Sequence, residues 1–429
     1  MMLNITKADG FSERMLINQI KSRSGETDRK VSAAVSEIIY AVRMGGDEAV
    51  REYTEKFDGA APANIEIGRA EMEAALKNSS SDFVYALHKA AENIRDFHER
   101  QKQQSWFNTF ENGTMVGQRI RGLERVGVYV PGGTAAYPSS VLMNVIPAKI
   151  AGVKEIIMVT PPGKDGKPNQ DILAAAAVAG VERIFLVGGA QAVAALAYGT
   201  ETIPRVDKIV GPGNIYVATA KKLLFGVVDI DMVAGPSEIL VVADETAEPK
   251  FLAADLMSQA EHDVLASAIL LTTSQRIAEE TIAELEIQSQ QMSRCDIIEK
   301  SLADYGAVIV CDTLSQAIDF ANELAPEHLE LCVKNPLEYI GRVDNAGSVF
   351  LGNYSPESVG DYYAGPNHVL PTGGTARFFS PLSVDSFIKK SSFIYYTASA
   401  LDSAKENIIT LANTEGLTAH ANAVEVRFK

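Results

Sequence analysis

The chain has 429 residues, of which 46% are hydrophobic and 22% charged, as in a globular protein of two or more domains. A net charge of −16 argues against nucleic acid as a partner, and three cysteines without a CxxC spacing argue against a disulfide framework or a thiolate zinc site. The N-terminus lacks the apolar region of a signal peptide, and the most apolar stretch, residues 172–181, is too short to span a bilayer. We therefore expect a cytoplasmic protein with reduced thiols and no membrane segment.

Residues 1 to about 120 are expected to be mainly helical. Apolar residues recur at helical spacing, and the paired glycines of RMGGDE indicate a stop between two helices. A second amphipathic pattern runs from residue 83 to residue 106. His88 and His98 fall on this pattern and are predicted to be surface residues of the helix.

The pattern changes near residue 125. Short β-branched runs such as EIIMVTPPG, RIFLVGGA and KIVGPGN end in Gly or Pro and alternate with helical patterns. This alternation predicts a parallel sheet with helices on both faces over residues 125–243. It resumes at residue 250 as a second α/β unit, and from about residue 381 a strand-like piece precedes a helical tail.

Two clusters of polar residues are candidates for chemistry. In MSQAEHD, Gln259 and His262 lie three apart on a predicted helix and point the same way, which suits two ligands of one metal ion but also an ordinary polar helix end. In ELAPEHLEL, Pro326 is expected to begin a helix, which places Glu327 and His328 in its first turn. Neighbouring Glu and His residues can serve as a general base pair, although an ordinary helix start has the same pattern.

The remaining histidines lie in the second half of the chain. Residues 360–378 contain four glycines and two prolines, so they are expected to form a long loop, with Asp361 and His368 as candidate ligands. His420 follows Glu415 by five residues near the C-terminus. A site built from His, Asp and an amide oxygen, without Cys, suits Zn²⁺ or a similar divalent ion.

Glycine-rich turns follow three predicted strands, at residues 130–133, 187–191 and 211–214. The last one opens a helix whose N-terminus can receive a phosphate group, although Tyr216 breaks the full GxGxxG pattern. Ligands of open α/β sheets bind beyond such strand ends. The three turns together predict a nucleotide or another small ligand.

From about residue 30 to the C-terminus, the chain resembles the histidinol dehydrogenase family. The resemblance rests on long, ordered motifs that include VGGAQAVAALAYGTE, VDKIVGPGNIYVATAKKLLFG, DLMSQAEHD, ELAPEHLEL, GDYYAGPNHVLPT and EGLTAHANAVEVR. It implies two incomplete Rossmann-like domains and a homodimer with one Zn²⁺ per subunit. It also implies the last step of histidine biosynthesis, the oxidation of L-histidinol through L-histidinal to L-histidine with two NAD⁺.

The resemblance also implies residue roles. The zinc ligands would be Gln259, His262, Asp361 and His420, the last from the partner subunit, and the catalytic acid–base pair would be Glu327 and His328. The substrate would be held by Ser237, His368 and Glu415 together with the four zinc ligands and His328. NAD would contact Tyr129, Gln191 and Asn214.

The expected domains follow from the same resemblance. They are an N-terminal helical segment (1–25), a discontinuous first α/β domain with the metal and acid–base residues (26–124 and 244–380), a second α/β domain with the NAD-binding turns (125–243), and a C-terminal segment that completes the dimer's active site (381–429).

The chemistry of the residues agrees with this activity. His328 would take the alcohol proton as the hydride leaves, and Glu327 would activate water to attack the retained aldehyde. Cys311 and Cys332 are expected to be buried core residues, not nucleophiles. The alternatives are a zinc hydrolase, which would not need the glycine-rich turns, a non-catalytic binding module, and a dehydrogenase of another alcohol.

Overall fold

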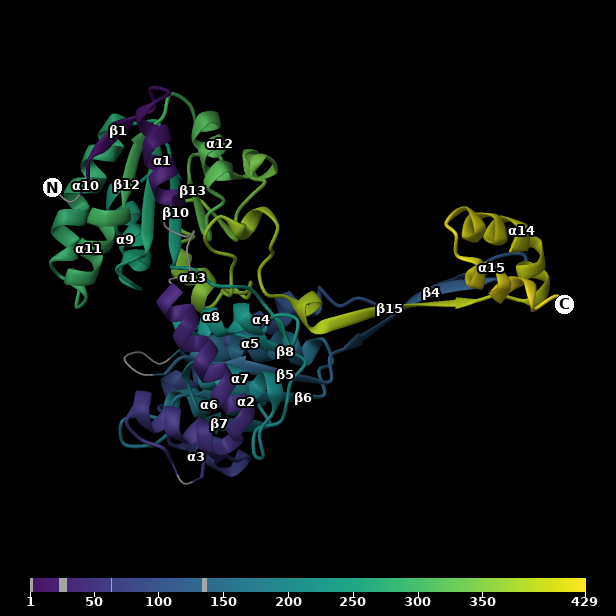
Figure 1. Ribbon diagram of the computed structural model, residues 1–429. Helices are drawn as coiled ribbons and strands as arrows, with labels where there is room; N and C mark the ends of the chain where they lie inside the picture. Colours follow the sequence, from purple (N-terminus) through teal and green to yellow (C-terminus); the bar gives the residue numbers. More distant parts are fainter. Residues whose placement is uncertain (1–2, 23–28, 63, 133–136) are drawn as a thin grey trace.

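The computed structural model describes residues 3–22, 29–62, 64–132 and 137–429. Two helix-covered sheets form the body, and a long ribbon carries two C-terminal helices away from it (Figure 1). Among the described residues, no helix is both long and apolar enough to cross a membrane. The expected turn at 130–133 is described only to residue 132, so Gly133 lies outside the described residues.

The first sheet has six parallel strands. Their order is β1 (Ile5–Lys7), β12 (Ala307–Val310), β11 (Ser267–Thr272), β10 (Glu238–Ala243), β13 (His328–Cys332) and β14 (Ser348–Leu351). Every residue of β10, β11 and β13 is buried, as expected where helices cover both faces of a sheet. One face packs on α9 (Pro249–Ala260), α10 (Gln275–Ser289) and α11 (Cys295–Tyr305), and the other on α1 (Ser12–Ser22) and α12 (Leu314–Leu324).

The second sheet also has six strands. Their order is β2 (Glu66–Ile67), β7 (Arg183–Leu186), β6 (Glu155–Thr160), β5 (Arg125–Tyr129), β8 (Lys208–Val210) and β9 (Asp229–Ile230), with only β2 antiparallel among the described strands. Its covering helices are α2 (Arg29–Asp58), α3 (Arg69–Asn78), α4 (Ser81–Glu99), α5 (Pro138–Ile150), α6 (Gln170–Ala179), α7 (Gly189–Tyr198) and α8 (Ile215–Leu224). The alternating strands and helices predicted after residue 125 are confirmed.

The sheets divide the chain differently from the expected ranges. Helices α2, α3 and α4, expected in the first domain, pack on the helices of the second sheet. Strand β10, expected at the end of the second domain, lies in the middle of the first sheet, and β1 of the expected N-terminal segment forms an edge of it. The apolar faces of α2–α4 therefore belong to the core around β5–β8.

Three local predictions can be compared with the structure. The glycine stop is confirmed, because Gly46 has φ 53° and interrupts α2. His88 is exposed as predicted, but the prediction for His98 was wrong: this side chain is fully buried, with Nδ1 2.8 Å from the Ile94 oxygen and Nε2 3.5 Å from Asn367 Nδ2. The predicted helix start at Pro326 was also wrong, since Glu327 precedes β13 and His328 begins it.

An antiparallel ribbon forms the third sheet. Strand β4 (Met115–Gly122) pairs with β3 (Trp106–Thr109) on one side and with β15 (Ile388–Tyr395) on the other. The ribbon leads to α14 (Ala398–Thr414) and α15 (Thr418–Glu425), which stand at its far end, away from both large sheets (Figure 1). The predicted strand and helical tail after residue 381 are thus confirmed.

Candidate active site

The centre of the site is the pair Glu327 and His328 at the amino edge of the first sheet. Both side chains contact the main chain of Glu238, the first residue of the neighbouring strand β10. The Glu238 N–H donates to Glu327 Oε2 at 2.9 Å, and His328 Nδ1 lies 3.0 Å from the Glu238 oxygen. His328 Nδ1 also lies 3.7 Å from Glu327 Oε2. His328 Nε2 is buried and has no hydrogen-bond partner among the described residues, so it is available to a substrate.

Electrostatics couple the two catalytic candidates. Burial raises the pKa of Glu327 to about 8, although His328 and the Glu238 N–H oppose the shift. Burial lowers the pKa of His328, but the Glu327 and Asp361 carboxylates outweigh it and raise that pKa to about 10. The pair therefore retains a proton at neutral pH, as a site for proton transfer requires.

Three ligand-type side chains converge next to this pair. One ligand atom from each of His262, Glu357 and Asp361 lies within 4.8 Å of the others. His262 follows the end of α9, whereas Glu357 and Asp361 lie one turn apart on the short helix α13 (Glu357–Tyr362). Asp361 Oδ1 is 3.8 Å from His328 Nε2, so the cluster borders the catalytic pair. Nitrogen and oxygen donors of this kind fit Zn²⁺.

Gln259 adds an oxygen to the same region. It lies three residues before His262 near the end of α9, and its side chain is only 1% exposed. Its Oε1 is buried without a hydrogen-bond partner among the described residues. An orphaned buried acceptor is unfavourable unless a donor or a cation satisfies it. The donor types of Gln259, His262 and Asp361, together with Glu357, are therefore suited to a divalent metal ion.

His368 joins the site across the boundary between the sheets. Its Nδ1 lies 3.1 Å from the Asp361 main-chain oxygen, and its Nε2 lies 3.2 Å from Oγ of Ser140 in the first turn of α5. Burial lowers the pKa of His368. Ser237 immediately precedes Glu238, at the same edge of the first sheet. Ser140 is a contact that the sequence reasoning missed.

The three residues expected to contact NAD gather at the carboxyl edge of the second sheet. Tyr129 ends β5, and its hydroxyl accepts the Gly189 N–H at 3.0 Å. Gln191 lies in the first turn of α7 and is fully buried, with neither side-chain Oε1 nor Nε2 paired among the described residues. Asn214 is the exposed N-cap of α8. Ligands of such sheets bind at this edge. Ser140, in the helix that follows β5, contacts His368 and so connects this edge to the cluster beside the catalytic pair.

Buried carboxyl groups behind the metal-type cluster were not predicted. The Glu357 N–H donates to Glu330 Oε1 at 2.9 Å, and Ser258 Oγ donates to Glu357 Oε2 at 2.7 Å. Burial raises the pKa of Glu330 well above its usual value, and that of Asp255 to about 6. Glu357 could have been predicted from the sequence, because it lies four residues before Asp361 and therefore on the same face of a helix.

Two predicted site residues lie far from this cluster. His420 is in α15 and Glu415 follows α14, and both side chains are exposed at the far end of the ribbon (Figure 1). Within one chain they do not meet the catalytic pair. By contrast, Cys311 and Cys332 are buried in the first domain with 3% exposure each, as predicted.

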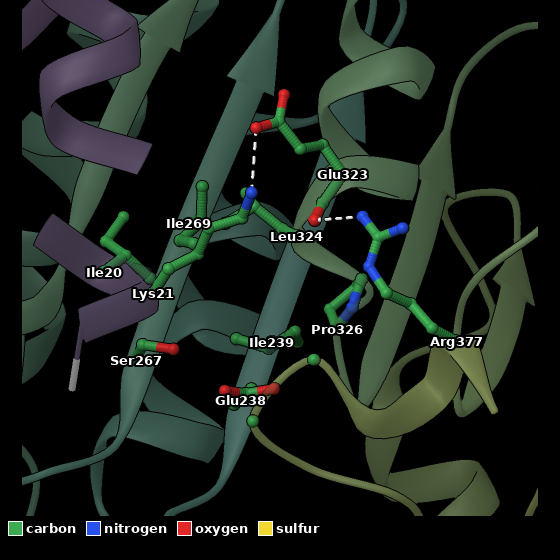
Figure 2. A pocket seen from close by; sticks show the side chains of 12 residues that line it. Ile20, Lys21, Glu238, Ile239, Ser267, Ile269, Glu323, Leu324, Pro326 and Arg377 are labelled. Atoms are coloured by element: carbon green, nitrogen blue, oxygen red, sulfur yellow. Dashed lines mark hydrogen bonds and ion pairs between the residues drawn. The ribbon is translucent and has the colours of Figure 1, made fainter. Parts of the chain in front are cut away.

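A separate cavity of about 220 Å³ lies beside the catalytic pair, with Glu238 and Pro326 in its wall (Figure 2). Its charged groups pair with one another. Lys21 Nζ lies 2.8 Å from Glu323 Oε1, and Arg377 Nη2 donates to the Glu323 main-chain oxygen at 2.6 Å. Glu327, His328, His262 and Asp361 are not among the residues that line the cavity, so it is separate from the catalytic cluster.

Two Rossmann-like domains, with an imidazole–carboxylate pair at the edge of the first sheet, are typical of an α/β oxidoreductase. The family model described as histidinol dehydrogenase matches residues 21–428. The chain belongs to the histidinol dehydrogenase family, whose members oxidise histidinol in histidine biosynthesis.

Individual relatives agree with this assignment. The chain is 57% identical to a histidinol dehydrogenase of Clostridium acetobutylicum, over 96% of this chain and 95% of that protein. It is 54% identical to one of Listeria monocytogenes, over 96% and 97% of the two chains. The crystal structure of histidinol dehydrogenase from Elizabethkingia anophelis superposes with a TM-score of 0.92 at 41% identity, covering 99% of this chain and 97% of that one.

Proposed function

We propose that the chain is a zinc-dependent homodimer that oxidises L-histidinol through L-histidinal to L-histidine with two NAD⁺. The observation that carries the proposal is the position of His328. Its unpaired Nε2 lies 3.8 Å from Asp361 Oδ1 in the metal-type cluster, and its Nδ1 is held by the Glu238 oxygen. A substrate bound at the cluster would therefore meet a nitrogen that is fixed in orientation and free to accept a proton.

His328 would remove the proton of the alcohol in the first oxidation. Ligation of Asp361 would reduce the negative charge that raises the pKa of His328, which favours the neutral imidazole needed for this role. Glu327, next to it, would take a proton from the water that attacks the aldehyde. Its raised pKa makes it a stronger base than an exposed carboxylate.

Gln259, His262 and Asp361 would hold the zinc ion, and Glu357 lies close enough to join them. The ion would orient the imidazole and amine of histidinol beside His328. His368 and Ser237, at the same edge of the first sheet, would hold the substrate. These roles rest on the donor types and on their common location.

NAD⁺ would lie at the carboxyl edge of the second sheet and accept the hydride. The unpaired amide of Gln191 has both a donor and an acceptor to offer, as the carboxamide of a nicotinamide ring requires. Tyr129 and Asn214 lie at the ends of neighbouring strands. The Ser140–His368 contact supports a hydride transfer across the boundary between the sheets.

The homodimer is supported by the ribbon and its helices. The ribbon exposes Ile394 by 72% and Tyr395 by 58%, and α14 and α15 bury only Ala400, Ala412 and Ala421. Such a segment gains little stability from its own chain and needs a surface to cover it. A partner subunit would supply that surface and would receive His420 and Glu415 in its active site.

The test is the amount of NADH formed per L-histidinol by purified protein, before and after removal of metal with a chelator. Two NADH per histidinol, lost on chelation and restored by Zn²⁺, is the expected result. NADH formed only from another alcohol would point to a related dehydrogenase. Absence of NADH from every alcohol, with hydrolysis of a peptide or ester, would favour the zinc hydrolase.

A further inference from the structure

A buried ion pair lies directly beneath the third glycine-rich turn. Lys221 of α8 pairs with Asp231, which follows β9, and their side chains are only 2% and 1% exposed. Burial of two charges carries a desolvation penalty that their attraction rarely exceeds, so a buried ion pair is weak evidence of a role in stability.

Both side chains bind the same residue, Gly211. Lys221 Nζ donates to the Gly211 oxygen at 3.0 Å, and the Gly211 N–H donates to Asp231 Oδ2 at 2.8 Å. Gly211 has φ +108°, and a Cβ there would lie 2.1 Å from the Tyr129 oxygen. The ion pair thus fixes both polar groups of a residue whose backbone conformation favours glycine and which packs on Tyr129.

The turn that begins at Gly211 ends at Asn214. The Asn214 side chain accepts the N–H groups of Tyr216 and Val217, at 3.0 and 3.2 Å, and so caps α8. One end of the turn is therefore held by the helix cap and the other by the ion pair. The turn thus contains Asn214 and packs through Gly211 on Tyr129, and both of these residues are among the three proposed to contact NAD.

We infer that Lys221 and Asp231 are positioning residues for the NAD site: they hold the turn at residues 211–214 in the shape that binds the dinucleotide. The inference rests on the proposed function, because it assumes that NAD binds at this edge of the second sheet. The ion pair does not touch the ligand, and acts through Gly211. A mere stabilising role would leave the affinity of the folded enzyme for NAD unchanged.

The test compares Lys221→Met, Asp231→Asn and the double variant Lys221→Met/Asp231→Asn with the unmodified chain. We expect the KM for NAD⁺ to rise about tenfold or more in Lys221→Met, because a small displacement of a binding loop has effects of this size. The KM for histidinol should stay within about twofold, since the metal-type cluster lies on the other sheet. The double variant removes the unpaired charge and should unfold at a higher temperature than Lys221→Met, yet keep the raised KM for NAD⁺.

Lys208→Met is the matched control. Lys208 Nζ lies 2.8 Å from Asp229 Oδ2, so this pair joins the neighbouring strands β8 and β9, but Asp229 is half exposed and, among the described residues, neither side chain is hydrogen-bonded to the turn. The control should leave both KM values unchanged. An unchanged KM for NAD⁺ in Lys221→Met and Asp231→Asn, or a KM that returns to normal with stability in the double variant, would overturn the inference.

Calorimetric titration of NAD⁺, which needs no turnover, separates this inference from the proposed function. If the unmodified chain binds NAD⁺ but does not oxidise histidinol, the proposed function fails while the variants still test the ion pair. If the unmodified chain binds no NAD⁺, both fail. If Lys221→Met does not fold, the double variant provides the test, because it removes the Lys221 bond to the Gly211 oxygen and leaves no unpaired buried charge.

Discussion

Glu238 holds both proposed catalytic residues, Glu327 and His328, through its main chain: its N–H donates to Glu327 Oε2 at 2.9 Å and its oxygen lies 3.0 Å from His328 Nδ1. The contact fixes the tautomer of the imidazole, because the nitrogen that faces a carbonyl oxygen must carry the proton. Nε2 is then the basic nitrogen, and it faces Asp361. Pairing of two parallel strands thus orients the base without using a further side chain.

The first prediction concerns Glu327→Gln. Gln keeps an oxygen for the Glu238 N–H and nearly the same volume, but it cannot take a proton from water. We expect the oxidation of histidinal to slow by about 10²-fold or more, with the affinity for histidinol maintained. Single-turnover measurement of NADH from histidinal, with a thermal unfolding curve as control for folding, checks this. Normal histidinal oxidation by the variant would exclude Glu327 as the base.

The second prediction concerns Glu357→Gln. Glu357 lies within 4.8 Å of the ligand atoms of His262 and Asp361, and loss of its charge should weaken zinc binding about tenfold. Zinc content after dialysis against graded chelator, measured by atomic emission, gives the affinity. Asp263→Asn is the control, since Asp263 is exposed one residue after His262. Equal zinc retention in both variants would remove Glu357 from the ligand set.

The third prediction concerns the shared site. His262→Ala and His420→Ala should each be inactive, but a mixture allowed to exchange subunits should regain about a quarter of the normal activity, because half of the dimers then contain one intact site. A mixture of His262→Ala with Asp361→Ala is the control. Both of those residues belong to the same chain's cluster, so no intact site forms. Recovery in the control, or none in the first mixture, contradicts a site completed by the partner.

The fourth prediction concerns Asp58 at the end of α2. Its Oδ2 is buried without a partner among the described residues, and burial raises its pKa to about 6. The folded state therefore binds this proton more tightly than the unfolded chain does, and the stability so gained is lost as the pH rises from about 4 to about 6. Asp58→Asn stays neutral and should be more stable than the unmodified chain at pH 8 by about 1 kcal/mol, after allowance for partial exposure, but not at pH 4.

Urea unfolding at pH 4 and pH 8 measures this difference. Asp96→Asn, at an exposed position near the end of α4, provides the comparison and should show little change between the two pH values. A stability gain of Asp58→Asn that is the same at both pH values would show that the carboxylate charge is not the cause.

The sequence predicted the buried strands of both sheets because those strands carry their own signal. Runs such as the one in β6 are short, β-branched and closed by Pro or Gly, and no distant contact is needed to recognise them. The prediction that Gln259 and His262 point the same way is local for a similar reason, because side chains three residues apart on a helix lie on the same face.

The errors arose where distant contacts decide the structure. Pro326 precedes either a helix or a strand equally well, and only pairing with β10 and β14 makes His328 the start of β13. The helical pattern around His98 suggested a surface position, but Asn367, far away in the sequence, lies with its Nδ2 3.5 Å from His98 Nε2. The positions of β2 in the second sheet and of β10 in the first sheet likewise depend on long-range pairing, which local patterns do not encode.

The ribbon also has a consequence for synthesis of the chain on the ribosome. Strand β4 (Met115–Gly122) receives its long partner β15 (Ile388–Tyr395) only when nearly all of the chain has been translated. Until then one edge of β4 has open hydrogen-bonding groups, and such an edge pairs readily with other nascent chains. The body can thus fold early, while the segment proposed to complete the partner's active site is the last to form. Slow translation would therefore prolong the period in which this edge of β4 is vulnerable to aggregation.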